Sequence, residues 1–169
     1  HTLQLPTNYR LRTLVFRGQP SPVHDAKAYA RNQSQKAHWQ RDKRVIVHQR
    51  PLKYLYEYDD DGKILKDEKG DKVFNGKREK GIDVLCALAV VTESLKSNVD
   101  LVILASADSD LAPALDQALD LGEAKIETTS WFDATRPRQS SQLRPTSRTV
   151  WNTRLGQSEF ERCWDRNEY

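Results

Sequence analysis

The stretch LVILASADSDLAPALDQALDLG, residues 101–122, decides how the chain folds. It opens with an apolar run that ends at Ser106, and such a run predicts a buried strand. Two aspartates, Asp108 and Asp110, follow at once, and the amphipathic residues 109–121 then predict a helix. A buried strand that leads through a short polar turn into a helix is typical of a parallel α/β sheet.

Both ends of the helix expected over residues 109–121 are marked in the sequence. Pro113 falls in its first turn, where no backbone hydrogen bond is lost, and Gly122 follows its last residue. Its apolar stripe consists of Leu111, Leu115, Ala118 and Leu119. This helix should therefore pack one face on the sheet.

Elements of the same two kinds surround this stretch. We expect further strands at Leu14–Phe16, at Val45–Val47 and over residues 124–132, and helices within residues 21–40 and 81–96. The second of these helices should turn one apolar face to the core, made of Val84, Leu85, Leu88, Val91, Thr92 and Leu95. The order of elements predicts an α/β fold with a mainly parallel sheet and right-handed connections.

The chain is long enough for one domain with a real core, and we place that domain at residues 1–133. Within it, residues 52–80 are polar and rich in glycine, so we expect a surface insertion with a hairpin that turns at Asp61–Gly62. Residues 134–169 form a basic C-terminal segment that we expect to pack on the same domain. Residues 134–157 of this segment contain no acidic residue and could either follow a phosphate backbone or form a solvated tail. The arginines of this stretch are Arg136, Arg138, Arg144, Arg148 and Arg154.

Composition excludes several classes of protein. Hydrophobic residues make up 37% and charged residues 30% of the 169 residues, which is typical of a soluble protein with a wet surface. No apolar run approaches the length of a membrane span and no signal peptide opens the chain, so we expect no membrane partner and a cytoplasmic location. Cys86 and Cys163 make no disulfide framework, and we expect Cys86 to be a core thiol.

The acidic residues suggest a cation site. Ligands of a parallel α/β sheet bind beyond the carboxyl ends of its strands, where Asp108 and Asp110 are expected, and Asp83 in the first turn of the preceding helix could join them. Three carboxylates so close would repel one another unless a cation lay among them. A hard divalent ion such as Mg²⁺ or Mn²⁺ suits oxygen ligands, and no Cys/His spacing indicates zinc.

A purely structural interpretation of the same residues stays open. Asp108 or Ser109 could cap the following helix, and Asp110 could be an acid that the helix dipole favours in the first turn. An Asp-x-Asp pair alone does not decide between the two interpretations.

Two motifs together resemble a known family. REKGIDVLCALAVV, followed about a dozen residues later by VDLVILASADSDLAPALDQALDLG, resembles the NYN-domain family of PIN-like ribonucleases over residues 78–132. The resemblance implies a Rossmann-like three-layer α/β/α sandwich with a mainly parallel sheet. It also implies a metal-dependent endoribonuclease that hydrolyses RNA phosphodiester bonds with Mg²⁺ or Mn²⁺.

The resemblance assigns roles by position. Asp83, Asp108 and Asp110 match the acidic catalytic residues and metal ligands of the family, while Ser106 and Ser109 match its small polar positions beside them. Arg78 and Lys80 precede Asp83 and could bind the phosphates of the substrate, or be ordinary solvated charges; the same holds for Lys53. The implied partner is RNA in single-stranded form, and a homodimer is compatible with the sequence.

The front of the chain departs from the family. Its members begin with a strand that ends in Asp-Gly-x-Asn, and nothing here matches that motif. If LVFRG were that first strand, Arg17 would lie where the aspartate is expected, but the segment fits the second strand of the family better. Either a first strand is missing upstream of His1, or the site lacks one acid. The sequence therefore leaves a second function open, an RNA-binding or regulatory PIN-like module with weak or no catalysis. A phosphatase of the haloacid dehalogenase type fits less well, because Leu111 and Ala112 follow the Asp-x-Asp pair.

Three residues at the end of the last expected strand complete the list of candidates. Trp131 and Phe132 could stack on bases, although we expect them to be buried. Asp133 could supply a further acid.

Overall fold

The computed structural model describes residues 10–137, 142–167 and 169. These residues divide into two compact units, one that runs to Ile82 and includes Tyr169, and one that starts at Asp83. The first unit contains β1 (Thr13–Gln19), α1 (Ala26–Trp39), β2 (Val45–Pro51), β3 (Lys53–Tyr56) and β4 (Phe74–Arg78). The second contains α2 (Ile82–Ser94, apart from its first residue), β5 (Leu101–Ala105), the 3₁₀ helix η1 (Ser109–Leu111), α3 (Ala112–Leu121), β6 (Lys125–Trp131), β7 (Trp151–Leu155) and α4 (Gln157–Cys163).

In the first unit, α1 connects two parallel strands. β1 and β2 pair from Thr13 opposite Val45 onwards, as expected for a strand–helix–strand crossover. The buried Asn32 of α1 donates to the carbonyl of Gly18 at 3.4 Å and accepts from Gln49 at 2.5 Å, which ties the helix to both strands. Polar contacts thus position α1 on the strand pair.

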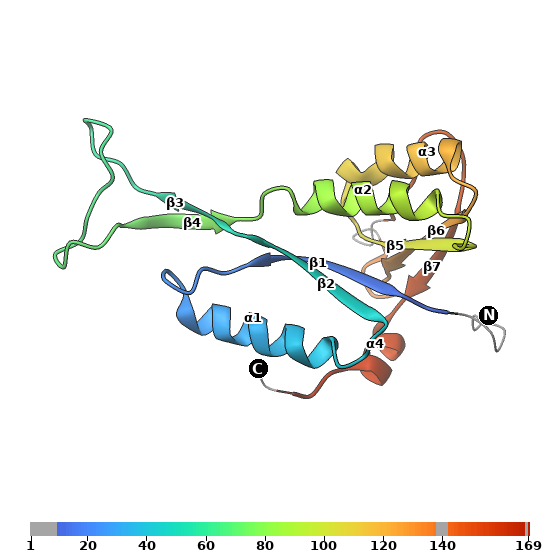
Figure 1. Ribbon diagram of the computed structural model, residues 1–169, viewed down its shortest axis with the longest axis horizontal. Coiled ribbons are helices and arrows are strands. Elements are labelled where there is room, and N and C mark those ends of the chain that lie inside the picture. Colours follow the sequence, from blue (N-terminus) through green and yellow to red (C-terminus); the bar gives the residue numbers. More distant parts are fainter. Residues whose placement is uncertain (1–9, 138–141, 168) are drawn as a thin grey trace. The chain divides into compact units, whose positions relative to one another are not determined.

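The insertion forms an arm that contains the predicted hairpin turn at Asp61–Gly62. Tyr58 pairs with Ile64 in an antiparallel bridge, and the amide of Leu65 donates to the carbonyl of Glu57 at 2.9 Å. Further from the turn, β3 pairs with β4, a pairing that was not predicted (Figure 1). The ring of Phe74 lies 5.5 Å from that of Tyr54 and 5.3 Å from that of Tyr56, and such ring contacts stabilise a strand pair.

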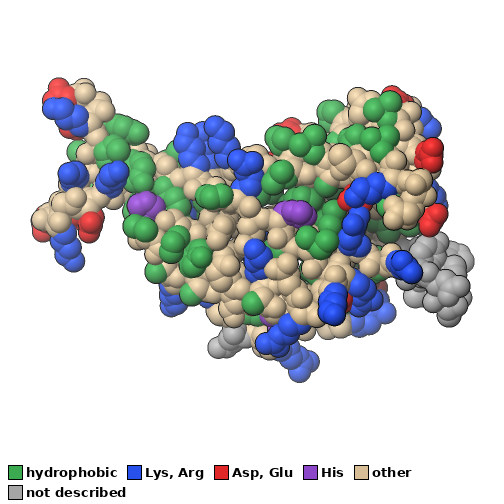
Figure 2. Space-filling view, viewed as in Figure 1, with side chains coloured by type: hydrophobic (Ala, Val, Ile, Leu, Met, Phe, Trp, Pro, Cys, Tyr) green, Lys and Arg blue, Asp and Glu red, His purple; other side chains and the backbone are tan. Residues whose placement is uncertain are grey.

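The ends of the arm do not form a surface of one charge. Figure 2 shows basic and acidic side chains next to each other there, in keeping with the mixed sequence of residues 57–72. The ends of the arm therefore lack the uniformly basic surface that a phosphate backbone would favour.

The second unit is a parallel sheet with two helices on one face. β6 lies between β5 and β7 and is parallel to both, which confirms an α/β fold with parallel pairing (Figure 1). Side chains of α2, η1, α3, one sheet face and the segment before β7 form its core, namely Val90, Leu104, Leu111, Leu115, Ala118, Ile126 and Leu143. On the other face Ile103 is 44% exposed. The third layer of the expected sandwich stays a prediction.

The apolar stripe of α3 is confirmed, whereas that of α2 is wrong. Val84, Leu88 and Leu95 are exposed, and α2 packs through Val90 with Cys86 beside it. The sequence of α2 is apolar on nearly every side, so the pattern alone could not choose a face. The small residues of the buried side let the helix approach the sheet closely.

The basic C-terminal segment belongs to the second unit. Its strand β7 pairs with β6 in the register Glu127 to Trp151 through Trp131 to Leu155, so the segment packs on the strand that precedes it. The division between compact units falls after Ile82, not at residue 133. Non-local pairing of β6 with β7, which no local pattern encodes, explains why the segment is continuous with the sheet.

Candidate site at the carboxyl edge of the β5–β6–β7 sheet

Parallel pairing brings the carboxyl ends of β5, β6 and β7 to one edge of the sheet, which we call the carboxyl edge. The strands end there at Ala105, Trp131 and Leu155. The amide of Phe132 donates to the carbonyl of Leu155 at 2.8 Å and fastens the ends of β6 and β7 to each other. In parallel α/β sheets this edge is where ligands bind.

The turn after β5 is built by its own polar residues. Ser106 Oγ accepts a hydrogen bond from the amide of Asp108 at 3.1 Å, and Asp108 Oδ1 accepts one from the amide of Asp110 at 2.9 Å. Asp108 is therefore the N-cap of η1, as the structural interpretation of the sequence proposed. Ser109 and Asp110 lie in η1 with their side chains exposed.

Asp83 and Asp108 lie near the same thiol. Burial raises the pKa of Cys86, and the negative charges of Asp83 and Asp108 raise it further. Asp83 is exposed in the first turn of α2, and Asp108 is half-buried at the end of β5. Two of the three predicted acids therefore raise the pKa of the same thiol. Cys86 itself packs against the core, as expected.

The residues present do not make a complete metal centre. Within residues 10–137, 142–167 and 169, no group of three or more His, Cys, Asp or Glu side chains is placed to hold a metal ion. One carboxylate oxygen of Asp108 is engaged as the helix cap. Three carboxylates around a cation are the arrangement that Mg²⁺ or Mn²⁺ would need, so we assign no step of a reaction to an ion here.

The basic candidates belong to the first unit. Arg78 ends β4 directly opposite Lys53 of β3, and both are exposed, as is Lys80. Like charges that face each other across a strand pair repel. An anion would relieve this repulsion, but the approach of these residues to the aspartates stays a prediction.

The structure also has a hollow at the carboxyl edge that the sequence did not reveal. It has a volume of about 300 Å³ and lies at the ends of β6 and β7, lined among others by Ser130, Trp131, Phe132, Gln142, Arg144 and Arg154. The guanidinium of Arg154 lies 4.8 Å from the ring centre of Phe132. The arginine-rich, acid-free residues 134–157 were the one signal of it in the sequence.

The predicted burial of Trp131 is wrong. It is the last residue of β6 and is 49% exposed, and its ring makes an edge-on contact with Phe160 of α4. Phe132 is half-buried. Asp133 accepts hydrogen bonds from the amide and hydroxyl of Thr135, at 2.8 and 2.6 Å, which lower the pKa of its carboxyl.

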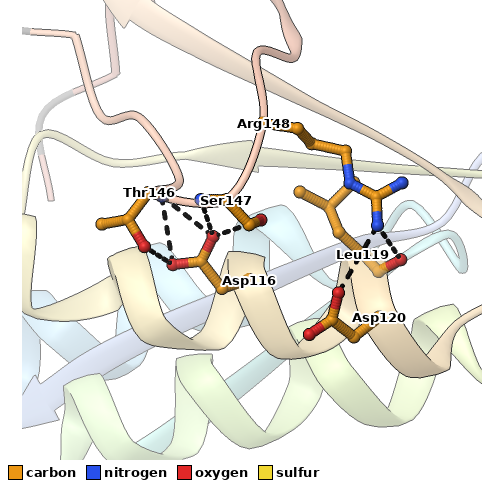
Figure 3. A network of polar contacts seen from close by, with 6 residues as sticks. All are labelled: Asp116, Leu119, Asp120, Thr146, Ser147 and Arg148. Carbon is orange, nitrogen blue, oxygen red and sulfur yellow. Dashed lines mark hydrogen bonds and ion pairs between the residues drawn. The ribbon is translucent and has the colours of Figure 1, made fainter.

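A clamp on α3 positions the segment that bears Arg144. The carboxylate of Asp116 accepts hydrogen bonds from the amides and hydroxyls of Thr146 and Ser147, and Arg148 bonds the carbonyl of Leu119 and the carboxylate of Asp120 (Figure 3). These donors hold the pKa of Asp116 far below its usual range.

Two separate contacts anchor this segment, one on each side of Arg144. Leu143 is buried in the core on one side of Arg144, and the Asp116 clamp holds the other side. Arg144 is therefore held near the hollow by its neighbours in the chain.

Comparison with known proteins adds no further assignment. No protein-family model, curated protein or solved structure matches the chain. Among the described residues, no helix combines the length and the apolar character that crossing a membrane requires.

Proposed function

We propose that this chain is a ribonuclease of the PIN-like kind, with Asp83, Asp108 and Asp110 as its acidic residues and Mg²⁺ or Mn²⁺ as its cofactor. Its substrate in this proposal is single-stranded RNA. In this proposal Ser106, Ser109, Arg78 and Lys80 bind the substrate, and the two basic residues contact its phosphates.

The position of the acids carries this proposal. Asp108 and Asp110 directly follow the carboxyl end of a strand in a parallel sheet, which is where α/β enzymes bind their ligands. The influence of both Asp83 and Asp108 on the pKa of Cys86 supports it, because acids from two elements then act on the same side chain.

A second candidate is an RNA-binding module with weak or no catalysis. One observation favours it: no complete metal-binding group is present among the described residues. The sequence adds that Arg17 of β1 would occupy the position of the family's first acid if β1 were the family's first strand. The side chain of Arg17 makes its contacts within the first unit: its guanidinium donates a hydrogen bond to Gln35 and lies 5.1 Å from the ring centre of Trp39.

Cleavage of labelled single-stranded RNA with Mn²⁺, Mg²⁺ or EDTA separates the two candidates. We compare the natural chain with Asp108→Asn and with Asp100→Asn as a matched control. Asn caps a helix as well as Asp does, so the first variant should fold. Asp100 is an exposed aspartate at the opposite, amino end of β5.

The nuclease predicts metal-dependent cutting that Asp108→Asn loses and Asp100→Asn keeps. Equal cutting by all three chains, or cutting in EDTA, would contradict the role given to Asp108 or to the ion. Binding of RNA without any cutting would establish the second candidate instead.

A further inference from the structure

We propose that Trp131, Phe160 and Trp164 form a platform on which the bases of single-stranded RNA stack, while Arg144 and Arg154 at the adjoining hollow bind its phosphates. We call these three side chains the aromatic row. The identity of the nucleic acid as RNA rests on the proposed function, whereas the platform rests on the contacts described next.

The aromatic row is continuous and open to solvent. The ring centres of Trp131 and Phe160 lie 6.2 Å apart with an edge-on contact, and those of Phe160 and Trp164 lie 5.8 Å apart in a stacked one. The three side chains are 49%, 47% and 62% exposed in chain order. Single exposed aromatics are common, but three that touch one another outside the core indicate a binding surface.

The charge beside the aromatic row fits a nucleic acid better than an apolar protein surface. In the part of the chain that the structure describes, neither Arg144 nor Arg154 lies within ion-pair distance of a carboxylate. Both side chains are exposed, and Trp131 lines the hollow that they share. Aromatic rings combined with a basic groove are how proteins bind single strands without reading their sequence.

Nearby acids do not cancel this charge. Glu159 accepts from the amide of Gly156 and pairs with Arg162, and Asp133 is engaged by Thr135. Glu161 accepts a hydrogen bond from Gln157. None of these carboxylates lies within ion-pair distance of Arg144 or Arg154 in the described residues, so both guanidiniums are open to an external anion.

The aromatic row and the acids lie at the same edge. Trp131 ends β6 and Asp108 follows β5, and these strands are neighbours, about 4.8 Å apart in a parallel sheet. A strand of RNA whose bases rest on the aromatic row could therefore pass the acidic turn. The platform thus gives the proposed ribonuclease a substrate preference for unpaired bases.

Fluorescence anisotropy of a labelled single-stranded RNA tests the platform, with EDTA present so that no cleavage occurs. The variants are Trp164→Ala and, as a matched control, Trp151→Ala, since both tryptophans are 62% exposed in the same unit. Trp151 begins β7 and so lies at the opposite edge of the sheet. We expect Trp164→Ala to weaken binding about tenfold and Trp151→Ala by less than about twofold.

Three companion measurements sharpen the test. Trp164→Tyr should restore binding because it keeps an aromatic face, and a duplex of the same sequence should bind more weakly because its bases are paired. Arg154→Ala should reduce the slope of log K against log salt by about 0.7. Circular dichroism of each variant checks that the fold is kept.

The outcomes separate the platform from the nuclease. Equal RNA affinity of Trp164→Ala and Trp151→Ala would overturn the platform, even if Asp108→Asn abolishes cleavage and the nuclease stands. Loss of affinity in Trp164→Ala alone, without cleavage by the natural chain, would establish the platform and overturn the nuclease. A natural chain that binds no RNA, or a Trp164→Ala variant that merely dissociates a dimer, would overturn the platform.

Discussion

The Asp116 carboxylate shows how much a single surface residue can organise. It accepts hydrogen bonds from two amides and two hydroxyls of Thr146 and Ser147, so it orders the segment that leads into β7. Because these donors favour the charged form, they lower the pKa of Asp116 in the folded state relative to the unfolded value of about 3.9. The stabilisation is therefore present above pH about 4 and is lost as the pH falls toward the folded pKa.

We expect Asp116→Asn to lower the midpoint of thermal unfolding at pH 7, with a deficit that shrinks as the pH falls from 5 to 3. Thermal unfolding followed by circular dichroism measures it, with Asp120→Asn as control. Asp120 makes a single, exposed contact with Arg148 at 3.4 Å, so its loss should matter less. A deficit that does not change with pH would show that the charge of Asp116 contributes nothing.

The acidic turn could be predicted from the sequence, but the exposure of Trp131 could not. Asp108 follows an apolar run and precedes an amphipathic one, so its place at the end of β5 is encoded locally. The surroundings of Trp131 depend on α4, which lies nearly thirty residues further along the chain. For the same reason the hollow, which is lined from β6, β7 and the segment between them, had only a compositional signal.

Among the helices, α3 is the one whose buried face the sequence predicted best. Leu115 is fully buried between the sheet and the neighbouring side chains of the core. We expect Leu115→Ala to lower the free energy of unfolding by about 2–5 kcal/mol, because it removes apolar contact and leaves a cavity. Urea denaturation measures this, and the exposed Leu121 of the same helix is the control, with an expected change within about 0.5 kcal/mol. Similar losses in both variants would contradict the observed orientation of α3.

The end of α3 is packed so closely against the end of α2 that a methyl group does not fit. A Cβ on Gly122 would lie 2.6 Å from the carbonyl oxygen of Ala118 and would collide with Ser94, whose side chain is fully buried. The backbone of Gly122 has an ordinary φ of −83°, so the expected effect is steric and not conformational. We expect Gly122→Ala to destabilise the protein by about 1–3 kcal/mol in urea denaturation.

Two controls locate the cause of that effect. The double variant Gly122→Ala with Ser94→Gly should recover part of the loss, because it removes the side chain that collides. Gly62→Ala has open space around its Cβ but a φ of +76°, so any loss there is conformational. No loss in Gly122→Ala would mean that the two helix ends are less closely packed than described.

The two helices also show where pattern reasoning works and where it fails. The stripe of α3 alternates with polar residues, so only one face can be buried. α2 has apolar residues on several sides. Val90 is buried and Leu88 is exposed because of the way the helix packs against the sheet. Tertiary packing, which no window of the sequence contains, decided that orientation.

For the whole molecule, the division after Ile82 separates parts of different expected stability. The second unit has a contiguous apolar core under a three-stranded parallel sheet. The arm of the first unit is a two-stranded ribbon, and every side chain of β4 is exposed. An isolated pair of strands is marginally stable in water, whereas strands that cover a core open only with the rest of the unit.

Hydrogen exchange followed by mass spectrometry should therefore show different exchange rates in the two units. We expect peptides of β3 and β4 to exchange fastest among the strands and those of β5 and β6 slowest, because the latter lie over the buried Leu104 and Ile126. The parallel pair β1 and β2, which α1 covers through Asn32, should be intermediate. Single-stranded RNA added in EDTA provides the decisive comparison: under the proposed platform it slows exchange at the end of β6 and in α4, and it leaves residues 57–72, at the ends of the arm, unchanged. Protection of residues 57–72 without protection of α4 would instead place the binding surface on the ends of the arm.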